Sequence, residues 1–281
     1  MGNDMFVKSA NFNVKQIADS GQCFRMNLIE KDKYSLIAYD KYLELSQIDD
    51  ETVKLSCSED EFKDIWIDYF DLNYDYGKII QLLSDGEDPF LRKITDFGKG
   101  IRILQQEPFE AMISFIISQN KNIPAIKSCI EALCSKYGEP KVSIGENNNT
   151  YYAFPTPYAL AQAESTELLQ LKTGYRDQYI IRASQAVMEG LIDFNYLKKC
   201  DSTEAVKVLK SVHGIGDKVA NCILLFGLHH IEAFPVDVWI KKVLEEIYHN
   251  DFPLEKYDGF AGIVQQYMFY YMRCCPDKSF G

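Results

Sequence analysis

The sequence predicts an α+β fold, with an N-terminal antiparallel β-sheet subdomain packed on a mainly helical body that contains a helix-hairpin-helix motif. Apolar and polar residues alternate in four short segments between residues 24 and 57, and apolar residues recur at helical spacing through most of the chain that follows. A Gly-Ile-Gly turn also separates two short helical patterns. We therefore expect the sheet with flanking helices in residues 1–100 and the helical body in residues 101–281, with the hairpin at 202–228.

The predicted strands are separated by charged turn pairs. Lys-Asp, Asp-Lys and Asp-Asp pairs lie between segments at residues 24–29, 34–39, 42–47 and 53–57. This spacing is typical of an antiparallel sheet. Residues 145–150, Gly-Glu-Asn-Asn-Asn-Thr, have no apolar side chain and predict a solvent loop.

Helical patterns follow the sheet. An apolar stripe at residues 62–72 predicts the first helix, and prolines start predicted helices at 108–117 and 124–137. The polar residues 118–122 join these two helices, and a C-terminal helix is expected at about 257–273.

The composition is that of a globular protein. Of 281 residues, 47% are hydrophobic and 13% are aromatic, which allows a sizeable core. No run of about 18 apolar residues is present, and the N-terminus lacks the apolar stretch of a signal peptide. We expect a soluble, intracellular monomer without membrane contact, cytoplasmic or nucleoid-associated if bacterial. Most of the eight cysteines lie within apolar patterns, which favours reduced thiols.

The net charge of −11 argues against a nucleic-acid partner, because the phosphate backbone selects basic proteins. A DNA-binding protein of this charge needs its positive groups and helix N-termini concentrated on one face.

The predicted hairpin has the features of a phosphate-binding turn. A short helix is expected at residues 202–211, Gly214 and Gly216 break it, and Asp217 is expected to cap a second helix. The glycines allow the backbone to approach a ligand closely, and the N–H groups at the start of the new helix can hold a phosphate. No residue in this turn predicts base-specific contacts.

Two side chains near the hairpin indicate chemistry. Lys218 lies in the first turn of the second helix, where the helix dipole disfavours an ammonium and favours the neutral, nucleophilic amine. Asp237 follows a Pro-Val pair in an apolar setting, where a carboxylate is costly without a function. We expect both groups to face one cleft. The alternative is a plain turn between core helices with a surface lysine.

This stretch resembles the helix-hairpin-helix, Gly/Pro-rich loop and aspartate superfamily of DNA base-excision glycosylases. Lys218 matches the lysine of its bifunctional members, and Asp237 matches the family's aspartate. The segment Ser-Gly-Gln-Cys-Phe-Arg at residues 20–25 more narrowly resembles the 8-oxoguanine DNA glycosylase branch.

The resemblance implies a pocket for an extruded purine. The carbonyl of Gly21 would accept the hydrogen that oxidised guanine carries at N7 and normal guanine lacks. Gln265 and Phe269, one helical turn apart, match a glutamine that bonds the Watson–Crick edge and a phenylalanine that stacks on the base. The other implied pocket residues are Cys222, Phe115 and Pro235.

The resemblance also implies DNA contacts outside the pocket. Asn120 matches an asparagine that enters the gap left by the base, and Tyr175 and Arg176 match an aromatic wedge and an arginine for the opposite cytosine. Ala125 replaces a second arginine of the eukaryotic enzymes, so we expect a weaker preference for cytosine. The other implied DNA contacts are His213, Gly214, Gly216 and Trp239. Hairpin carbonyls near Val212 and Ile215 are implied to hold a monovalent cation.

The implied reaction joins base excision to strand cleavage on double-stranded DNA that contains oxidised guanine. Lys218 attacks the sugar C1′ and forms a Schiff base that permits β-elimination, and Asp237 stabilises the oxocarbenium-like transition state. No cofactor or catalytic metal is expected, since the four histidines are scattered and Cys274 and Cys275 are isolated.

Three alternatives remain open. Glycosylases for alkylated bases share the layout but typically lack the hairpin lysine. Endonuclease III relatives, which act on oxidised pyrimidines, usually carry a four-cysteine iron-sulfur cluster. A noncatalytic DNA-binding module would bind lesion and normal duplex equally and would cleave neither.

Overall fold

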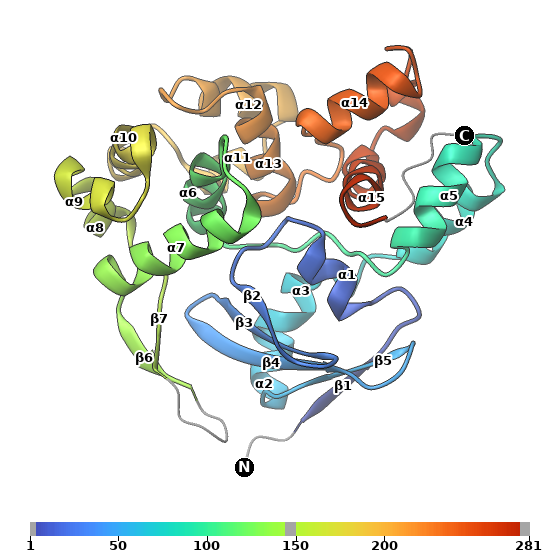
Figure 1. The fold of residues 1–281 in the computed structure, drawn as a ribbon, viewed down its shortest axis with the longest axis horizontal. Helices are drawn as coiled ribbons and strands as arrows, with labels where there is room; N and C mark the ends of the chain where they lie inside the picture. The colour runs from blue at the N-terminus through green and yellow to red at the C-terminus, as the bar shows by residue number, and fades with distance from the viewer. Residues whose placement is uncertain (1–3, 144–149, 276–281) are drawn as a thin grey trace.

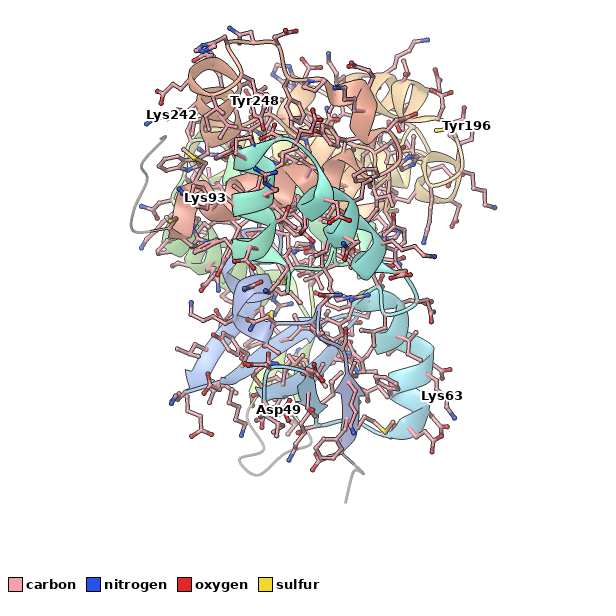
Figure 2. The ribbon with its side chains drawn as sticks, turned by 90° about the vertical axis from the view of Figure 1, so that its right-hand side faces the viewer. Asp49, Lys63, Lys93, Tyr196, Lys242 and Tyr248 are labelled. Atoms are coloured by element: carbon pink, nitrogen blue, oxygen red, sulfur yellow. The ribbon has the colours of Figure 1, made fainter. Side chains whose placement is uncertain are left out.

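The computed structural model describes residues 4–143 and 150–275. A five-stranded sheet lies below a larger group of helices (Figure 1). The side view keeps this division, with Asp49 and Lys63 on the sheet side and Lys93, Tyr248 and Lys242 on the helical side (Figure 2). The α+β prediction is therefore confirmed.

The sheet is antiparallel throughout, with strand order β1-β5-β4-β3-β2. Strands β2 to β5 form a meander, and β1 joins it at the outer edge of β5. The strands are β1 (Met5–Lys8), β2 (Met26–Glu30), β3 (Lys33–Ala38), β4 (Lys41–Gln47) and β5 (Thr52–Leu55).

Alternation along the strands gives the sheet one buried face. In β3, every second residue is buried, and Leu36 pairs with the equally buried Leu43 of β4. Trp66 and Phe70 pack in the same core. Trp66 comes from a short helical run made of α2 (Glu59–Glu61), the π-helical turn η1 (Phe62–Trp66) and α3 (Ile67–Tyr69), and Phe70 is the C-cap residue of that run.

The rest of the chain is mainly helical. Its longer helices are α4 (Tyr76–Asp85), α5 (Pro89–Gly98), α6 (Pro108–Ser118), α7 (Ile123–Tyr137), α10 (Asp177–Met188), α12 (Ser202–Lys210), α13 (Asp217–Gly227), α14 (Val238–Glu246) and α15 (Ala261–Cys274). The shorter elements are α1 (Val14–Asp19), α8 (Pro157–Ala161), α9 (Ser165–Gln170), α11 (Phe194–Leu197), the 3₁₀ turns η2 (Gly174–Arg176) and η3 (Leu254–Tyr257), and a hairpin of β6 (Pro140–Val142) and β7 (Thr150–Tyr152).

Helix α6 is the centre of the helical body. Residues 109–117 are all buried, because neighbouring helices cover it on every side. Its closest partner is α13, the second helix of the hairpin. This contact holds the hairpin rigidly against the core, with the N-terminus of α13 beside the C-terminus of α6.

The predicted boundary near residue 100 stays a prediction, and packing crosses it. Helix α5 precedes the boundary but packs on α15. Arg25, at the start of the sheet, donates to Glu131 of α7 at 2.9 Å and to the carbonyl of Tyr152 at 2.7 Å. Arg273 of α15 donates to the carbonyl of Asp19 in α1. The two parts are therefore closely joined.

The structure differs from the sequence prediction at several local points. Strands β1, β6 and β7 were not predicted, because each is only three or four residues long. Gly216, not Asp217, is the N-cap of α13, and Asp217 is its first helical residue. Helix α15 begins at Ala261, after η3, and not near residue 257. Most of the loop predicted at 145–150 lies outside the described residues.

None of the helices in the described part of the chain combines the length and the apolar character needed to span a bilayer.

Candidate active site

The hairpin turn exposes backbone between α12 and α13. Gly214 has a φ of +102°, and a Cβ there would lie 2.3 Å from the ring of Tyr179, so only glycine fits. Gly216 is exposed, and nothing lies within 4 Å of the place where its Cβ would be. The first N–H groups of α13 therefore stay accessible, as a phosphate-binding turn requires.

One carbonyl of the turn keeps a lone pair that could bind a cation. The oxygen of Val212 accepts the N–H of Ile215 at 3.1 Å, which leaves it a second lone pair. A monovalent cation would share this oxygen with that bond. This bond does not exclude Val212 as a ligand, and the predicted cation site at Val212 and Ile215 stays a prediction.

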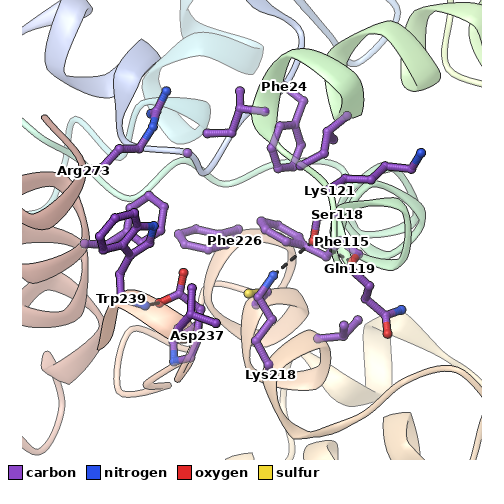
Figure 3. A pocket seen from close by; sticks show the side chains of 18 of the residues that line it. Phe24, Phe115, Ser118, Gln119, Lys121, Lys218, Phe226, Asp237, Trp239 and Arg273 are labelled. Atoms are coloured by element: carbon purple, nitrogen blue, oxygen red, sulfur yellow. Dashed lines mark hydrogen bonds between the residues drawn. The ribbon is translucent and has the colours of Figure 1, made fainter. Parts of the chain in front are cut away.

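Lys218 extends from the first turn of α13 into a cavity (Figure 3). Its Nζ donates to Oγ of Ser118 at 3.1 Å and lies 5.3 Å from the ring centroid of Phe115. Ser118 in turn donates its only hydrogen to the carbonyl of Phe115 at 2.8 Å. Ser118 can therefore only accept from Lys218, which fixes where the amine points.

Asp237 is the N-cap of α14, and its carboxylate points into the same cavity (Figure 3). Its Oδ1 accepts the N–H groups of Trp239 at 3.0 Å and Ile240 at 2.9 Å. Burial raises the pKa of Asp237 above its usual value, while the N–H of Ile240 and the charge of Lys218 act in the opposite direction. The structure thus brings an amine and a half-buried carboxylate into one space, as the sequence predicted.

The cavity has a volume of about 850 Å³ and an aromatic wall. Phe115 stacks on Phe226 with ring centroids 5.3 Å apart, and Phe24 meets Phe115 edge-on at 5.6 Å. All six predicted pocket residues line it: Gly21, Phe115, Cys222, Pro235, Gln265 and Phe269. Burial raises the pKa of the Cys222 thiol to about 11, so this side chain is a neutral, apolar part of the wall.

Gly21 and Phe269 form a narrow point of the cavity. Gly21 has a φ of +75°, and a Cβ there would lie 2.7 Å from Cε1 of Phe269. Any other residue would be strained and would displace the ring. The glycine therefore sets the distance between the chain at residue 21 and the aromatic face.

Two glutamines end the cavity on the α15 side. Gln265 donates from Nε2 to the carbonyl of Pro235 at 2.9 Å, and Gln266 donates from Nε2 to Oε1 of Gln265 at 3.1 Å. Both are almost fully buried, at 3% exposure each. Buried amides at a cavity wall are groups that can select a ligand by hydrogen bonding.

Beside the cavity mouth, two loops bond to each other, and we call them the wedge cluster (residues 119–121 and 172–176). Asn120 is exposed and donates from Nδ2 to the hydroxyl of Tyr175 at 3.0 Å. Lys121 donates to the carbonyl of Lys172 at 2.6 Å. Tyr175 is 51% exposed, as a wedge requires.

Arg176 is placed differently from the DNA contact that its resemblance implies. It is buried, with its guanidinium 4.3 Å from the ring of Tyr175. It donates to the carbonyls of Thr173, at 2.9 Å, and Gln119. In this state the arginine holds the wedge cluster together.

The other predicted DNA contacts lie around the cavity. Trp239 lines the cavity beside Asp237 (Figure 3). His213 is exposed at the hairpin and meets Tyr179 edge-on at 5.1 Å, and Tyr179 in turn meets Tyr175 at 5.8 Å. A row of rings thus connects the hairpin with the wedge cluster.

Positive side chains outnumber negative ones in the cavity lining, whereas the whole chain is acidic. Lys121, Lys218 and Arg273 line it together with Asp217 and Asp237. The formal charge of these five side chains is +1, whereas that of the whole chain is −11.

The sequence reading missed several cavity residues. They include Phe24, Ser118, Phe226, Gln266 and Arg273. Two of them could have been predicted from helical spacing, because residues three or four apart share one face of a helix. Ser118 lies three residues after Phe115, and Phe226 lies four residues after Cys222. Nowhere in residues 4–143 and 150–275 do three or more histidine, cysteine, aspartate or glutamate side chains gather as metal ligands would.

Comparisons with solved structures show close similarity over the whole chain. An 8-oxoguanine glycosylase/lyase of Clostridium acetobutylicum, solved with double-stranded DNA containing cytosine opposite to 8-oxoG, has a TM-score of 0.87 and 38% identity, covering 97% of this chain and 99% of that one. A 3-methyladenine DNA-glycosylase from Archaeoglobus fulgidus has a TM-score of 0.74 at 17% identity, covering 96% and 99%, and shares the fold.

Two relatives are similar in sequence. A probable N-glycosylase/DNA lyase of Methanothermobacter thermautotrophicus is 32% identical over 233 residues, covering 73% of this chain and 72% of the relative. The N-glycosylase/DNA lyase of Saccharomyces cerevisiae is 29% identical over 266 residues, covering 86% and 70%.

Family matches divide the chain into two adjoining parts. Residues 4–112 match the family described as 8-oxoguanine DNA glycosylase, N-terminal domain. Residues 113–256, which contain the hairpin, Lys218 and Asp237, match the family described as HhH-GPD superfamily base excision DNA repair protein. The chain belongs to this superfamily of base excision DNA repair proteins.

Proposed function

We propose that this protein is a bifunctional DNA glycosylase and lyase that excises 8-oxoguanine from duplex DNA. The observation that carries the proposal is the shared cavity of about 850 Å³, which is lined by the amine of Lys218, the carboxylate of Asp237, Gly21 and Phe269. The names of the relatives, N-glycosylase/DNA lyase and 8-oxoguanine glycosylase/lyase, agree with this geometry.

The first chemical step releases the base. The unshared electron pair of the Lys218 amine attacks C1′, the bond from C1′ to N9 breaks, and the base leaves with the bonding electron pair and takes up a proton that the attacking nitrogen loses. Positive charge develops on the sugar as this bond lengthens, and the anion of Asp237 stabilises it. Ser118 holds Nζ from one side, so that the amine enters the reaction already oriented.

The second step cleaves the strand. Once the sugar ring opens, the C1′ carbon and Nζ of Lys218 form a Schiff base, which makes the C2′ hydrogen acidic. Loss of that proton and departure of the 3′ phosphate complete β-elimination. Hydrolysis of the Schiff base then returns the free lysine.

The base pocket suits an everted purine. Extrusion costs a few kcal/mol of stacking, and the wall of Phe115 and Phe226 with the ring of Phe269 replaces part of it. We propose that the carbonyl of Gly21 accepts the N7 hydrogen of 8-oxoguanine, and that Gln265 pairs with its Watson–Crick edge. Outside the pocket, we propose that Asn120 and Tyr175 fill the gap in the duplex. A protein with this activity works where the genome lies, which is the nucleoid if the source is bacterial.

Duplexes that differ only in the lesion test the substrate. Single-turnover cleavage is compared for 8-oxoguanine, a methylated purine and an oxidised pyrimidine. We expect 8-oxoguanine to be excised fastest, and faster cleavage of either other lesion would contradict the proposal. Because Ala125 is small and exposed, the same lesion opposite each of the four bases should show only a weak preference for cytosine.

A further inference from the structure

Gln266 has no role in the chemistry described so far, yet it lies at the base pocket. It follows Gln265 in α15, lines the cavity and is only 3% exposed. A buried amide at this place requires a physical reason, because an apolar side chain of the same size would pack there at lower cost.

Two hydrogen bonds fix the orientation of the Gln265 amide, and Gln266 makes the second of them. The carbonyl of Pro235 can only accept, so the atom of Gln265 that faces it, 2.9 Å away, is the donor Nε2. Oε1 of Gln265 therefore faces the other way, towards Gln266. Only a donor can meet that oxygen, and Nε2 of Gln266 does so at 3.1 Å.

The remaining atom of Gln266 is left without a partner. Its Oε1 is buried and accepts no hydrogen bond from the residues that the structure describes. This unpaired oxygen destabilises the folded protein. The useful contribution of Gln266 is therefore the hydrogen bond that it donates to Gln265.

A fixed amide distinguishes two kinds of purine. The Watson–Crick edge of a guanine-type base presents an acceptor at position 6 beside a donor at N1, and that of an adenine-type base presents a donor beside an acceptor. An amide can pair with either edge, but for a base held in one position the two edges need opposite orientations of the amide. An amide fixed in one orientation therefore binds one class of purine and disfavours binding of the other.

We propose that Gln266 is a specificity-determining positioning residue, which together with the carbonyl of Pro235 holds the amide of Gln265 in the orientation that matches guanine-type oxidised purines and mismatches adenine-type ones. This inference rests on the proposed function, in that it assumes that Gln265 meets the edge of an extruded base. It adds a residue that acts through Gln265 and that makes no bond to the base itself.

The test measures the ratio of single-turnover excision rates for 8-oxoguanine and 8-oxoadenine in one sequence context. Gln266→Leu removes the donor at similar volume, and we expect the ratio to fall roughly tenfold. Gln266→Glu replaces the donor by an acceptor when ionised and favours the opposite orientation of Gln265, so we expect a still lower ratio. Met268→Leu is the matched control, because Met268 is fully buried in the same helix and makes no polar contact with Gln265. Its ratio should equal that of the wild type.

Cleavage of a preformed abasic site is measured in parallel, since that substrate has no base to place in the pocket. We expect unchanged abasic-site cleavage in both Gln266 variants, which also shows that they are folded. An unchanged ratio in both variants, or an equal loss on both lesions, would overturn the role of Gln266. If the wild type fails to excise 8-oxoguanine, the proposed function itself is wrong.

Discussion

The cavity and the wedge cluster lie side by side but are built differently. Polar groups in the cavity bond to rigid parts of the fold, as Asp237 does to the first turn of α14 and Lys218 does to the end of α6. Polar groups of the wedge cluster bond to one another across two loops, as Asn120 does to Tyr175.

The difference indicates which region changes when DNA binds. The catalytic groups already face one space in the protein alone, so the chemistry needs no rearrangement of its own residues. The wedge cluster must give up internal bonds before its side chains can enter a duplex, and Arg176 must leave its buried position to reach an opposite base. Changes in the cavity should therefore alter rates, whereas changes in the wedge cluster should alter affinity.

Asp237→Asn should show the largest effect apart from loss of the lysine. Asparagine can still accept the N–H groups of Trp239 and Ile240, so the cap of α14 and the melting temperature should change little. The lost charge should slow base excision by about 10²–10³-fold. Single-turnover excision with a parallel melting curve measures both. A rate within a factor of three of the wild type would contradict the role of the carboxylate.

The pH dependence of excision by the wild type also tests the role of the Asp237 carboxylate. Burial raises the pKa of Asp237, and the active form is the carboxylate, so excision should decline as the pH falls through that raised pKa. The acid limb should therefore lie at higher pH than for an ordinary aspartate. Asp237→Asn should lack this limb, and an unchanged limb in the variant would assign it to another group.

Gly21→Ala should have the next largest effect. The substitution strains a residue at a φ of +75° and places a methyl group 2.7 Å from Phe269. We expect at least a roughly tenfold loss of 8-oxoguanine excision with abasic-site cleavage retained, and destabilisation by about 1–2 kcal/mol. Gly190→Ala is the matched control, because Gly190 has a φ of +73° and open space around the added carbon. Equal loss of excision in both variants would show that backbone strain, and not the contact with Phe269, is responsible.

Tyr175→Phe should have the smallest effect. It removes the hydroxyl that accepts from Asn120 at 3.0 Å and from Arg176 at 3.3 Å, but keeps the ring under the guanidinium of Arg176. Since the pair is exposed, stability should change by less than about 0.5 kcal/mol. Because Asn120 then no longer has to break this hydrogen bond before it enters the duplex, the affinity for lesion duplex should rise by about twofold. Equilibrium binding measures this, and markedly weaker binding would show that the hydroxyl contacts DNA.

Glycines in turns and reactive side chains at the starts of helices could be predicted from the sequence. The glycines at 21 and 214 have positive φ and close neighbours, and Lys218 and Asp237 stand at helix starts. The α+β division also followed from the change of hydrophobic period at the end of the sheet.

The features that could not be predicted from the sequence depend on contacts between segments that are distant in the chain. Lys218 meets Ser118 across 100 residues, and Gln265 meets Pro235 across 30, which no local pattern encodes. Strand β1 was missed for the same reason, because four residues form a strand only where β5 offers a partner. The cap of α13 was misassigned because aspartate is the commoner N-cap residue, whereas here the backbone of Gly216 takes that position.

The central claim is that Lys218 forms a covalent bond with the sugar of the damaged nucleotide inside the cavity. Borohydride reduction during reaction with 8-oxoguanine duplex tests it most directly, because it converts a Schiff base into a stable cross-link. We expect the wild type to give a cross-linked complex and Lys218→Gln to give none while still binding the duplex. Absence of the complex with the wild type, or an undiminished complex with Lys218→Gln, would contradict the claim.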